Sequence, residues 1–590
     1  MNEHWDLTRI YANEDLIEKD IAFCKNEMIP ALRKLEGHLG EKESLREYLD
    51  WQIKAEEILS KLGMYSSMKS DLDKKNVKNA AALAKVENLF YEYGSAVSYA
   101  DPEILALGKE YFAEFLKENP EYSQFDFGLE KLFHEAEHTL SGEKEKLISN
   151  FNPLLGQART LYTQLAVGDF QPKKITLSNG KEVEVNQSNW TNLEEEVGNP
   201  EDRKKVFEAL YSYYDDHKNV LGEIYSQVLN GQLAEVKSRG YSSILASHLN
   251  HNKIPESVFL NLIEVASTQS APLKKYLQIK RKYLGLDKIH SYDRFVQLAK
   301  SEKKYTYPEA QKLFWESIAQ FPADFQEKAH EVSKDGYVDV YHAPGKRSGA
   351  YSNGGENIHP YILLNFEGGL DDVFTLAHES GHSIHTLYAM ENQPLLKQGY
   401  TIFVAEIAST FNEHNLLDYL LKQGTLNKQD KIFLLQKSID EIVSTFYRQT
   451  LFGHYEYEAS KLAERGEPIN HEVLSNIMVK LYQDYYGIDI REEIYKPFVW
   501  AYIPHLFYTP FYVYQYATSF TASMLIYQNV RDGKPGAFEN YIKMLSSGGS
   551  MYPIEEVKLA GVDLTSKAPF EAVTKRMAEL VDELEKLLSE

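Results

Sequence analysis

Cysteine is almost absent from this sequence. Cys24 is the only one among 590 residues, so the chain can form no internal disulfide and no cysteine-based metal cluster. A large protein without disulfides is typical of a reducing compartment. The opening residues, Met1–Ile10, also lack the basic start and the apolar core of a secretory signal peptide. We therefore expect a cytoplasmic protein.

Positive charge and long apolar runs are also scarce. The 64 lysines and arginines stand against 87 acidic residues, which gives a net charge of −23. A surface of this sign repels a nucleic-acid backbone, so we expect no nucleic-acid partner. The most apolar stretch, residues 498–520, is interrupted by two prolines, a histidine and a glutamine. It indicates buried protein rather than a membrane span, and we expect no membrane partner.

Strand patterns are rare, and most of the sequence predicts helix. Apolar residues recur at spacings of three and four, with charged residues between them. Two segments depart from this pattern. In residues 175–185, Asn179-Gly180 suits the tight turn of a hairpin. Residues 337–366 carry apolar runs on either side of a glycine-rich bend, which predicts a small β-sheet just before the segment that carries the chemistry.

A polar segment that ends at Asn199-Pro200 predicts a domain boundary. We expect an N-terminal helical domain over residues 1–198, including the hairpin near 175–185. Residues 199–590 would then form the catalytic domain. The length of the chain is ample for two domains or for one large elaborated domain.

Two segments match H-E-x-x-H, a spacing that places two histidines on one helix face, where they can bind a metal. In the first match, residues 134–138, the neighbouring apolar residues form one helical stripe. They are Leu129, Leu132, Phe133, Ala136 and Leu140. At about 100° per residue, His134 and His138 fall nearly opposite this stripe. We interpret the first match as a solvent-facing helix surface and not as a metal site.

The second match is His378-Glu379-Ser380-Gly381-His382. Apolar or small residues surround it on every side, which predicts a buried helix. Burying two histidines and a glutamate without partners costs free energy, and a bound metal ion would offset that cost. We predict His378 and His382 as metal ligands and Glu379 as the general base, with Gly381 leaving room beside the site. Hydrogen-bonded core histidines are the alternative.

A catalytic zinc ion usually takes three protein ligands and keeps one position for water. His385 lies on the same helix face and is a rival third ligand. The extended metzincin pattern is excluded, because it requires glycine at 385 and histidine at 388, where Tyr388 stands. Glu406 and Glu413 are seven residues apart among apolar and small residues, so they share a face of a second helix. We assign Glu406 as the ligand and Glu413 as a group that orients a ligand histidine; an ordinary surface acid is the alternative for Glu413.

Several separated segments resemble the oligoendopeptidase F branch of the thimet-oligopeptidase-like zinc peptidases, family M3. They are WDLTRIYAN (5–13), KRSGAYSNGG (346–355), HPYILLNF (359–366), DDVFTLAHESGHSIHTLY (371–388), EIASTFNE (406–413) and PHLFYTPFYVYQYATSF (504–520). The resemblance implies a mostly helical ellipsoid with a deep substrate channel. It also implies oligopeptide substrates cut at internal bonds, and one zinc ion held by His378, His382 and Glu406, with Glu379 as base.

The late aromatic segment predicts groups that contact the substrate. Tyr508, Tyr512 and Tyr516 follow His505 at offsets of three, seven and eleven, which places all four on one helix face. We predict that His505 and Tyr508 donate hydrogen bonds to the developing oxyanion, and that Tyr512 and Tyr516 bind substrate. An aromatic core stripe is the alternative.

The segment before the metal-binding helix, Ser348 to Tyr351, predicts an edge strand that pairs with the substrate backbone. Gly349 and Ala350 are its predicted contacts with the substrate. Such pairing would tolerate many substrate sequences.

Taken together, these patterns predict a zinc endopeptidase that hydrolyses short peptides. One alternative is an exopeptidase on a related helical scaffold, either a carboxypeptidase or a dipeptidyl carboxypeptidase. It would need a charged group to hold a chain terminus, and the sequence does not identify one. A peptide-binding protein that has lost catalysis is a second alternative, against which the intact Glu379 argues. A structural zinc site is a third, but such sites usually have four protein ligands and favour cysteine.

Overall fold

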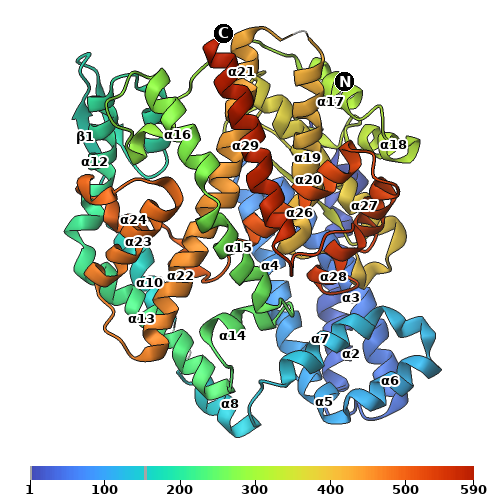
Figure 1. Cartoon of the computed structure of the whole chain (residues 1–590). Coiled ribbons are helices and arrows are strands. Elements are labelled where there is room, and N and C mark those ends of the chain that lie inside the picture. The colour runs from blue at the N-terminus through green and yellow to red at the C-terminus, as the bar shows by residue number, and fades with distance from the viewer. Residues whose placement is uncertain (1–2, 152–153, 155, 425) are drawn as a thin grey trace. The chain divides into compact units, whose positions relative to one another are not determined.

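The computed structural model describes residues 3–151, 154, 156–424 and 426–590, and most of them lie in helices (Figure 1). The prediction of a mostly α fold is confirmed. The chain forms two compact units, each built from separate stretches of sequence: unit 1 is Met1–Glu137, Glu302–Lys422 and Ile526–Val562, and unit 2 is His138–Ser301, Gln423–Leu525 and Asp563–Glu590. The predicted boundary at 198/199 does not coincide with a change of unit, and it stays a prediction.

Unit 1 contains the predicted metal-binding helix. Its helices are α1 (Glu14–Phe23), α2 (Ile29–Lys34), α3 (Lys42–Leu72), α4 (Val77–Val97), α5 (Ala100–Leu107), α6 (Lys109–Glu118), α7 (Asp126–Ala136), α17 (Tyr307–Ser317), α18 (Ala323–Val332), α19 (Leu370–Asn392), α20 (Ile402–Lys422), α27 (Ala537–Leu545) and α28 (Pro553–Leu559). The helix α19 packs against α17, α18, α20 and α27, which explains why it is buried on nearly every side.

Unit 1 also holds the predicted small sheet. Its strands are β3 (Val338–Asp339), β4 (Tyr351–Gly355) and β5 (Ile358–Leu363), in the order β3-β5-β4. The strand β5 is parallel to β3 and antiparallel to β4. The turn between β4 and β5 is Glu356-Asn357, and both residues have positive φ, 48° and 65°, as tight hairpin turns require. The strand β4 therefore lies at the edge of the sheet, and β5 follows it in the chain before α19 begins.

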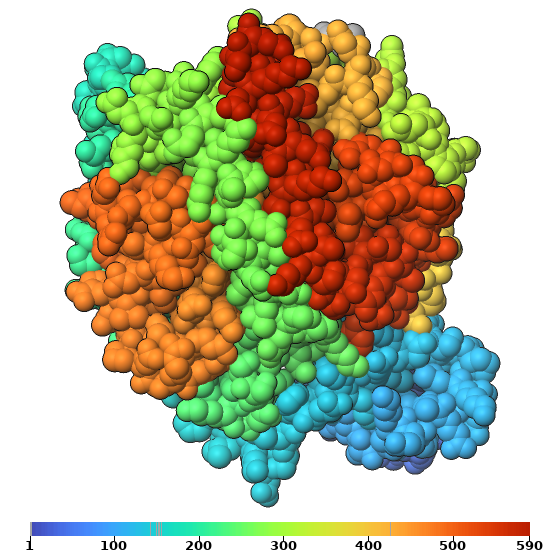
Figure 2. Space-filling model, viewed as in Figure 1, coloured from blue at the N-terminus to red at the C-terminus, as the bar shows by residue number. Residues whose placement is uncertain are grey.

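Unit 2 carries the remaining helices. They are α8 (Gly142–Ser149), α10 (Gln157–Thr163), α11 (Trp190–Glu196), α12 (Pro200–Asp216), α13 (Lys218–Arg239), α14 (Ile244–Asn250), α15 (Glu256–Thr268), α16 (Ala271–Tyr283), α21 (Lys428–Glu441), α22 (Arg448–Arg465), α23 (His471–Tyr486), α24 (Val499–Tyr502), α25 (His505–Tyr508) and α29 (Ala568–Ser589), and α26 (Tyr514–Arg531) continues into unit 1. Figure 2 shows the C-terminal helix α29, in dark red, packed along α15 and α16.

The predicted hairpin is present in unit 2 as β1 (Lys173–Thr176) and β2 (Glu182–Val185). Gly180 lies in its turn with φ +82°, a conformation that glycine adopts without strain. None of the helices in the described part of the chain combines the length and apolar character needed to cross a bilayer.

The helix α19 begins at Leu370, and an acidic side chain of its first turn caps it. The carboxylate of Asp372 accepts hydrogen bonds from the backbone N–H groups of Gly369 (2.8 Å) and Glu367 (3.1 Å). An acidic residue in the first turn also interacts favourably with the helix dipole. The start of α19 fixes the register of the residues that follow, including the two histidines of the second motif.

Gly381 allows α19 and α20 to approach closely. A Cβ atom at this position would lie 2.4 Å from the carbonyl oxygen of Ala408 and 2.6 Å from the Cα of Ser409. Both atoms belong to the backbone of α20, so a side-chain rearrangement cannot relieve the contact. Gly381 is thus required at the point where the two helices cross, one residue before His382.

We expect Gly381→Ala to destabilise unit 1 by about 1–3 kcal/mol, the usual cost of overpacking a core, and to weaken metal binding. Gly94→Ala is the matched control, because Gly94 is a glycine within α4 where an added Cβ would meet no described atom within 4 Å. That control should raise stability by roughly 1 kcal/mol through helix propensity. Urea unfolding and zinc content of both variants test this. Equal stability of the two variants would contradict the role given to Gly381.

Candidate metal centre

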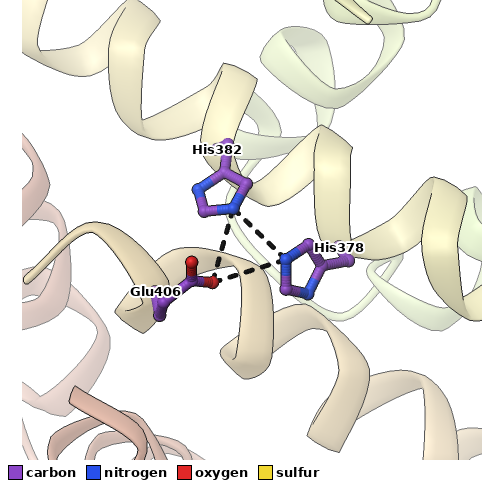
Figure 3. A group of neighbouring side chains, drawn as sticks. All are labelled: His378, His382 and Glu406. Carbon is purple, nitrogen blue, oxygen red and sulfur yellow. Dashed lines mark hydrogen bonds and ion pairs between the residues drawn. The ribbon is translucent and has the colours of Figure 1, made fainter. Parts of the chain in front are cut away.

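Two helices bring the three predicted ligands together. His378 and His382 project from α19, one turn apart, and Glu406 projects from α20 (Figure 3). The Nε2 atoms of the two histidines are 3.2 Å apart, and each is 3.4 Å from Oε2 of Glu406. These residues form a group that could hold a metal ion. Their role as ligands remains a prediction that this arrangement supports.

The separations of the three ligand atoms suit a zinc ion. Ligand atoms about 2.0–2.1 Å from a tetrahedral zinc lie roughly 3.3–3.4 Å from one another. The three observed separations, 3.2, 3.4 and 3.4 Å, match this triangle without rearrangement. Two imidazole nitrogens and one carboxylate oxygen are also the donor types of many catalytic zinc sites, which leave one position open.

Glu413 contacts His378, as its predicted orienting role requires. Its Oε1 lies 2.5 Å from Nδ1 of His378, so the opposite nitrogen, Nε2, faces Glu406 and His382. The Glu413 side chain is only 14% exposed, and the alternative of a surface acid does not hold. Burial lowers the pKa of His378 in the metal-free chain, but Glu413 and Glu406 raise that pKa well above its ordinary value. The carboxylate also increases the basicity of a histidine that binds metal.

Two further residues of α20 support the cluster, and the sequence analysis did not identify them. Ser409 donates a hydrogen bond to Oε2 of Glu406 at 2.8 Å. Asn412 donates to the carbonyl oxygen of Ala377 at 3.0 Å, which ties α20 to α19 beside His378. The signal that the sequence offers is their place as polar residues among apolar neighbours of α20.

Glu379 lies beside the cluster and is only 6% exposed. Its Oε2 atom has no hydrogen-bond partner in the described part of the chain. Burial raises the pKa of Glu379, and His378 and His382 partly offset this effect. A buried carboxylate oxygen without a partner fits a site that holds water or substrate when it works.

His385, the rival third ligand, lies outside the cluster. It is almost fully buried, and its ring stacks flat on Tyr400, with centroids 3.7 Å apart and planes 8° apart. Burial lowers the pKa of His385 to about 3, so this histidine is neutral at physiological pH. The ring thus packs against Tyr400 and away from the three predicted ligands.

A pocket of 490 Å³ opens over the cluster. It is lined by Ala350, Tyr351, Ser352, Asn353, Gly354, Gly355, Glu356, His378, Glu379, His382, Thr386, Gln398, Gly399, Tyr400, Ile402, Ala405 and Glu406. One wall is the strand β4. The predicted edge strand was placed too early in the chain, because Ser348 to Ala350 precede β4 and only Tyr351 belongs to it. Ala350 lines the pocket, whereas Gly349 does not. Gly349 has φ +81°, so a bulky residue there would strain the backbone. A change in activity on substituting Gly349 would therefore not show by itself that this residue contacts the substrate.

The pairing within the sheet shows which backbone groups of β4 face away from it. Ser352 stands opposite Ile362, and the N–H of Ile362 donates to Tyr337 on the other side of β5. In an antiparallel pair, opposite residues either exchange both hydrogen bonds or neither. The N–H and C=O groups of Ser352 therefore point away from β5, toward the unpaired edge of the sheet as far as the structure describes it.

The late aromatic segment does not form one helix, and that prediction is wrong. The helix α25 ends at Tyr508 and α26 begins at Tyr514. Between them, Pro510 disfavours a helical conformation for the residue before it, and Phe511 adopts a φ of +55°.

The four predicted residues of this segment all belong to unit 2, whereas the metal cluster belongs to unit 1. The rings of His505 and Tyr512 lie parallel at 6.1 Å, and Tyr516 lies edge-on to Tyr512 at 5.6 Å. Tyr508 instead lies within hydrogen-bond distance of Thr163, with 3.0 Å between the hydroxyl oxygens. Their roles toward oxyanion and substrate stay predictions.

The first H-E-x-x-H match is not a solvent-facing helix surface, so that part of the interpretation is wrong. The side chain of His134 is only 13% exposed and lies edge-on to Tyr552 at 6.2 Å. The helix α7 ends at Ala136, and the ring of His138 stacks on Tyr241 at 3.8 Å. Aromatic partners from distant parts of the chain cover both histidines. Neither belongs to a group of three potential metal ligands among the described residues.

Comparison with known proteins gives consistent matches over the whole chain. The family model described as peptidase family M3 matches residues 194–576, and the model described as oligopeptidase F matches residues 103–171. The chain is 35% identical to oligopeptidase PepF of Bacillus subtilis (strain 168), with 99% of this chain and 87% of that protein covered. It is 32% identical to group B oligopeptidase PepB of Streptococcus agalactiae, with 99% and 97% covered. The crystal structure of oligoendopeptidase-F from Enterococcus faecium matches at 27% identity with a TM-score of 0.75, with 98% of this chain and 99% of that chain covered.

We expect Glu413→Gln to weaken zinc binding by about 10- to 100-fold, the usual effect of removing a carboxylate that orients a ligand histidine. Glu43→Gln is the control, because the Glu43 side chain is 85% exposed and its replacement removes the same charge from unit 1. Competition with a chromophoric chelator measures both affinities. If Glu413→Gln binds zinc as tightly as the control, Glu413 does not orient His378.

The raised pKa of Glu356 predicts that the stability of the folded chain depends on pH. Burial raises its pKa from 4.5 to about 7, and Glu56 adds to the effect. The folded chain therefore holds this proton more tightly than the unfolded chain, so the contribution of Glu356 to stability falls as pH rises from about 4.5 to about 7. We expect the melting temperature of metal-free Glu356→Gln to exceed that of the parent by more at pH 8 than at pH 5. A difference that is the same at both pH values would contradict this assignment.

Proposed function

The chain belongs to peptidase family M3, and from that premise we propose that it is a zinc-dependent endopeptidase that hydrolyses internal bonds of short peptides. Peptide hydrolysis by a metallopeptidase follows from the family. The observation that carries the finer proposal is the triangle of His378, His382 and Glu406, with the buried Glu379 beside it. We also propose that the protein acts in the cytoplasm, which its single cysteine supports.

The residues of the cluster fit one zinc ion per chain. The Nε2 atoms of His378 and His382 and a carboxylate oxygen of Glu406 would hold it. A zinc ion in this position polarises a peptide carbonyl and lowers the pKa of water. Glu413 holds His378 in the required orientation, and Ser409 holds the carboxylate of Glu406.

Glu379 supplies the proton transfers of the reaction. Its carboxylate accepts the proton of the attacking water and then passes it to the nitrogen of the leaving amine. Burial, which raises the pKa of Glu379, suits this role, because the carboxyl group must accept a proton readily and hold it until the amine leaves. The Oε2 atom, which has no partner among the described residues, is available for this exchange.

The strand β4 would hold the substrate in an extended conformation. The backbone N–H and C=O groups of Ser352 lie on the unpaired edge of the sheet, where a peptide can add as a further strand. Recognition through backbone groups tolerates many side chains and requires an extended chain. Short flexible peptides meet that requirement and folded proteins do not. The deep channel that the resemblance implies would likewise admit short peptides and exclude folded proteins.

Two alternatives can be distinguished from this proposal by the peptides that each would cleave. An exopeptidase would require a free chain terminus close to the cleaved bond, and it would not cut a peptide whose ends are both blocked. A peptide-binding protein without catalysis would cut neither kind of peptide. The presence of a buried Glu379 next to the cluster favours catalysis, because a binding protein has no use for a general base.

The test is Glu379→Gln assayed beside the parent on an internally quenched peptide with both ends blocked, with zinc measured in each. We expect cleavage by the variant to fall by about 10²- to 10⁴-fold, the usual contribution of a general base, with zinc near one per chain. A parent that trims only unblocked peptides would be an exopeptidase. A variant that cuts as fast as the parent would remove Glu379 from the mechanism.

Substrate binding by β4 can be tested without changing the protein. In a set of peptides that each carry one N-methylated amide, we expect one or two positions near the cleaved bond to raise KM by about tenfold, the scale of one lost hydrogen bond. Methylation elsewhere should leave KM unchanged and serves as the control. If no amide near the cleaved bond, other than the cleaved amide itself, is sensitive, the substrate does not pair with β4.

A further inference from the structure

Unit 2 contains a cavity of 470 Å³ with a single arginine in its wall. It is lined by Tyr162, Ala166, Val167, Gln187, Arg448, Gln449, Phe452, Tyr502, Ile503, Pro504, His505, Val513 and Tyr516. Most of these side chains are aromatic or aliphatic. Arg448, Gln449 and Phe452 come from the first turns of α22, and Arg448 is the residue with which that helix begins.

Arg448 has no acidic partner among the residues that the structure describes. Its guanidinium lies over the ring of Phe452 at 4.7 Å and is 3.5 Å from the hydroxyl of Tyr482, the outer limit of a hydrogen bond. Arg294 lies close enough to repel it, and the guanidinium of Arg294 is itself placed over Phe295 at 4.2 Å, with an unpartnered Nε. In the described part of the chain, no carboxylate is within ion-pair distance of either arginine.

A further basic side chain, Lys496, lies near these arginines, and its acidic neighbours are Glu194 and Glu493. The ammonium of Lys496 lies 5.5 Å from the ring of Tyr482 and 4.8 Å from that of Tyr211, and it is almost fully buried. Of these two acids, Glu194 is fully buried with both oxygens unpartnered, and burial raises its pKa well above the ordinary value. Burial therefore opposes the ionisation of Glu194, which reduces its capacity to offset the neighbouring cations.

Arg203, in the same unit, shows which partners this chain provides for a buried guanidinium. Arg203 is paired with Asp293 at 2.8 Å and donates to the carbonyl oxygens of Val197 and Gly198. Removing a cation from water without such partners costs free energy. Arg448 is part-buried and has none of them, so the contrast with Arg203 requires a reason. Arg448 differs from Arg203 in facing a cavity, which leaves room for an anion to enter and complete the pairing.

We propose that this cavity binds the C-terminal carboxylate of an oligopeptide, with Arg448 as its anchor. This rests on the proposed function, since peptides are taken as the ligands. The planar guanidinium matches a carboxylate with two parallel hydrogen bonds. The aromatic and aliphatic walls suit the side chain of the last residue, and the volume lies within the range of small-ligand pockets. A small inorganic anion would need neither those walls nor that volume.

The first test changes only the ligand. In the Glu379→Gln background, which prevents cleavage, fluorescence anisotropy measures the affinity of two peptides of identical sequence, one ending in a free carboxylate and one in an amide. We expect the acid to bind about tenfold more tightly or better, the scale of a charge-assisted pair. Equal affinity of acid and amide would overturn the proposal.

The second test changes the anchor. Arg448→Met should abolish the preference for the acid and should fold, because an apolar side chain of similar size replaces a part-buried charge that has no acidic partner among the described residues. Arg448→Lys should keep part of the preference, since it retains the charge without the planar fork. Arg491→Met is the control, because the Arg491 side chain is 71% exposed in the same unit. A preference that survives in Arg448→Met would place the carboxylate elsewhere and overturn the assignment.

Three outcomes separate this inference from its alternatives. If inorganic phosphate raises the melting temperature in an Arg448-dependent way while acid and amide bind equally, the occupant is a small inorganic anion and the peptide assignment is wrong. If the parent fails to cut any peptide but prefers the acid through Arg448, the carboxylate site stands and the proposed endopeptidase function falls. If the parent cuts peptides but binds acid and amide equally, the carboxylate site is wrong and the proposed endopeptidase function stands.

Discussion

The close approach of α19 and α20 at Gly381 is the constraint on which the candidate site depends. Two histidines one turn apart on a helix supply two ligand atoms, and the third must come from a neighbouring helix at a distance of a few ångströms. With backbone atoms of Ala408 and Ser409 within 2.6 Å of a Cβ at position 381, only glycine permits that approach. The 3.4 Å separations from Glu406, the contact of Glu413 with His378 and the bond from Asn412 to Ala377 all follow from it.

Sequence reasoning predicted the parts of this site that local spacing determines. The i and i+4 histidines, the seven-residue offset between Glu406 and Glu413, and the burial of the second motif all follow from helix geometry and residue type. The mostly helical fold, the hairpin and the small sheet before α19 were predicted for the same reason. Ser409 was missed because a serine within a helix usually has a local role, and its bond to Glu406 depends on a rotamer that the sequence does not specify.

The errors arise where contacts join distant parts of the chain or where the backbone departs from a helix. His134 and His138 were placed toward solvent, because Tyr552 and Tyr241 are far from them in sequence. His505 to Tyr516 was treated as one helix, although Pro510 and the positive φ of Phe511 interrupt it. The unpaired Arg448 also escaped notice, because an arginine at the start of a helix is ordinary until its partners are known. Together, these residues show that the partners of polar and aromatic side chains can be identified only from the tertiary structure.

The most direct test of the central claim uses the two H-E-x-x-H motifs against each other. Zinc content and cleavage of a blocked peptide would be measured for the parent, for His382→Ala and for His138→Ala, which removes the equivalent histidine of the first motif. The account predicts one zinc per chain and full cleavage in the parent and in His138→Ala, and loss of both in His382→Ala. Retention of zinc and activity by His382→Ala, or their loss in His138→Ala alone, would contradict it.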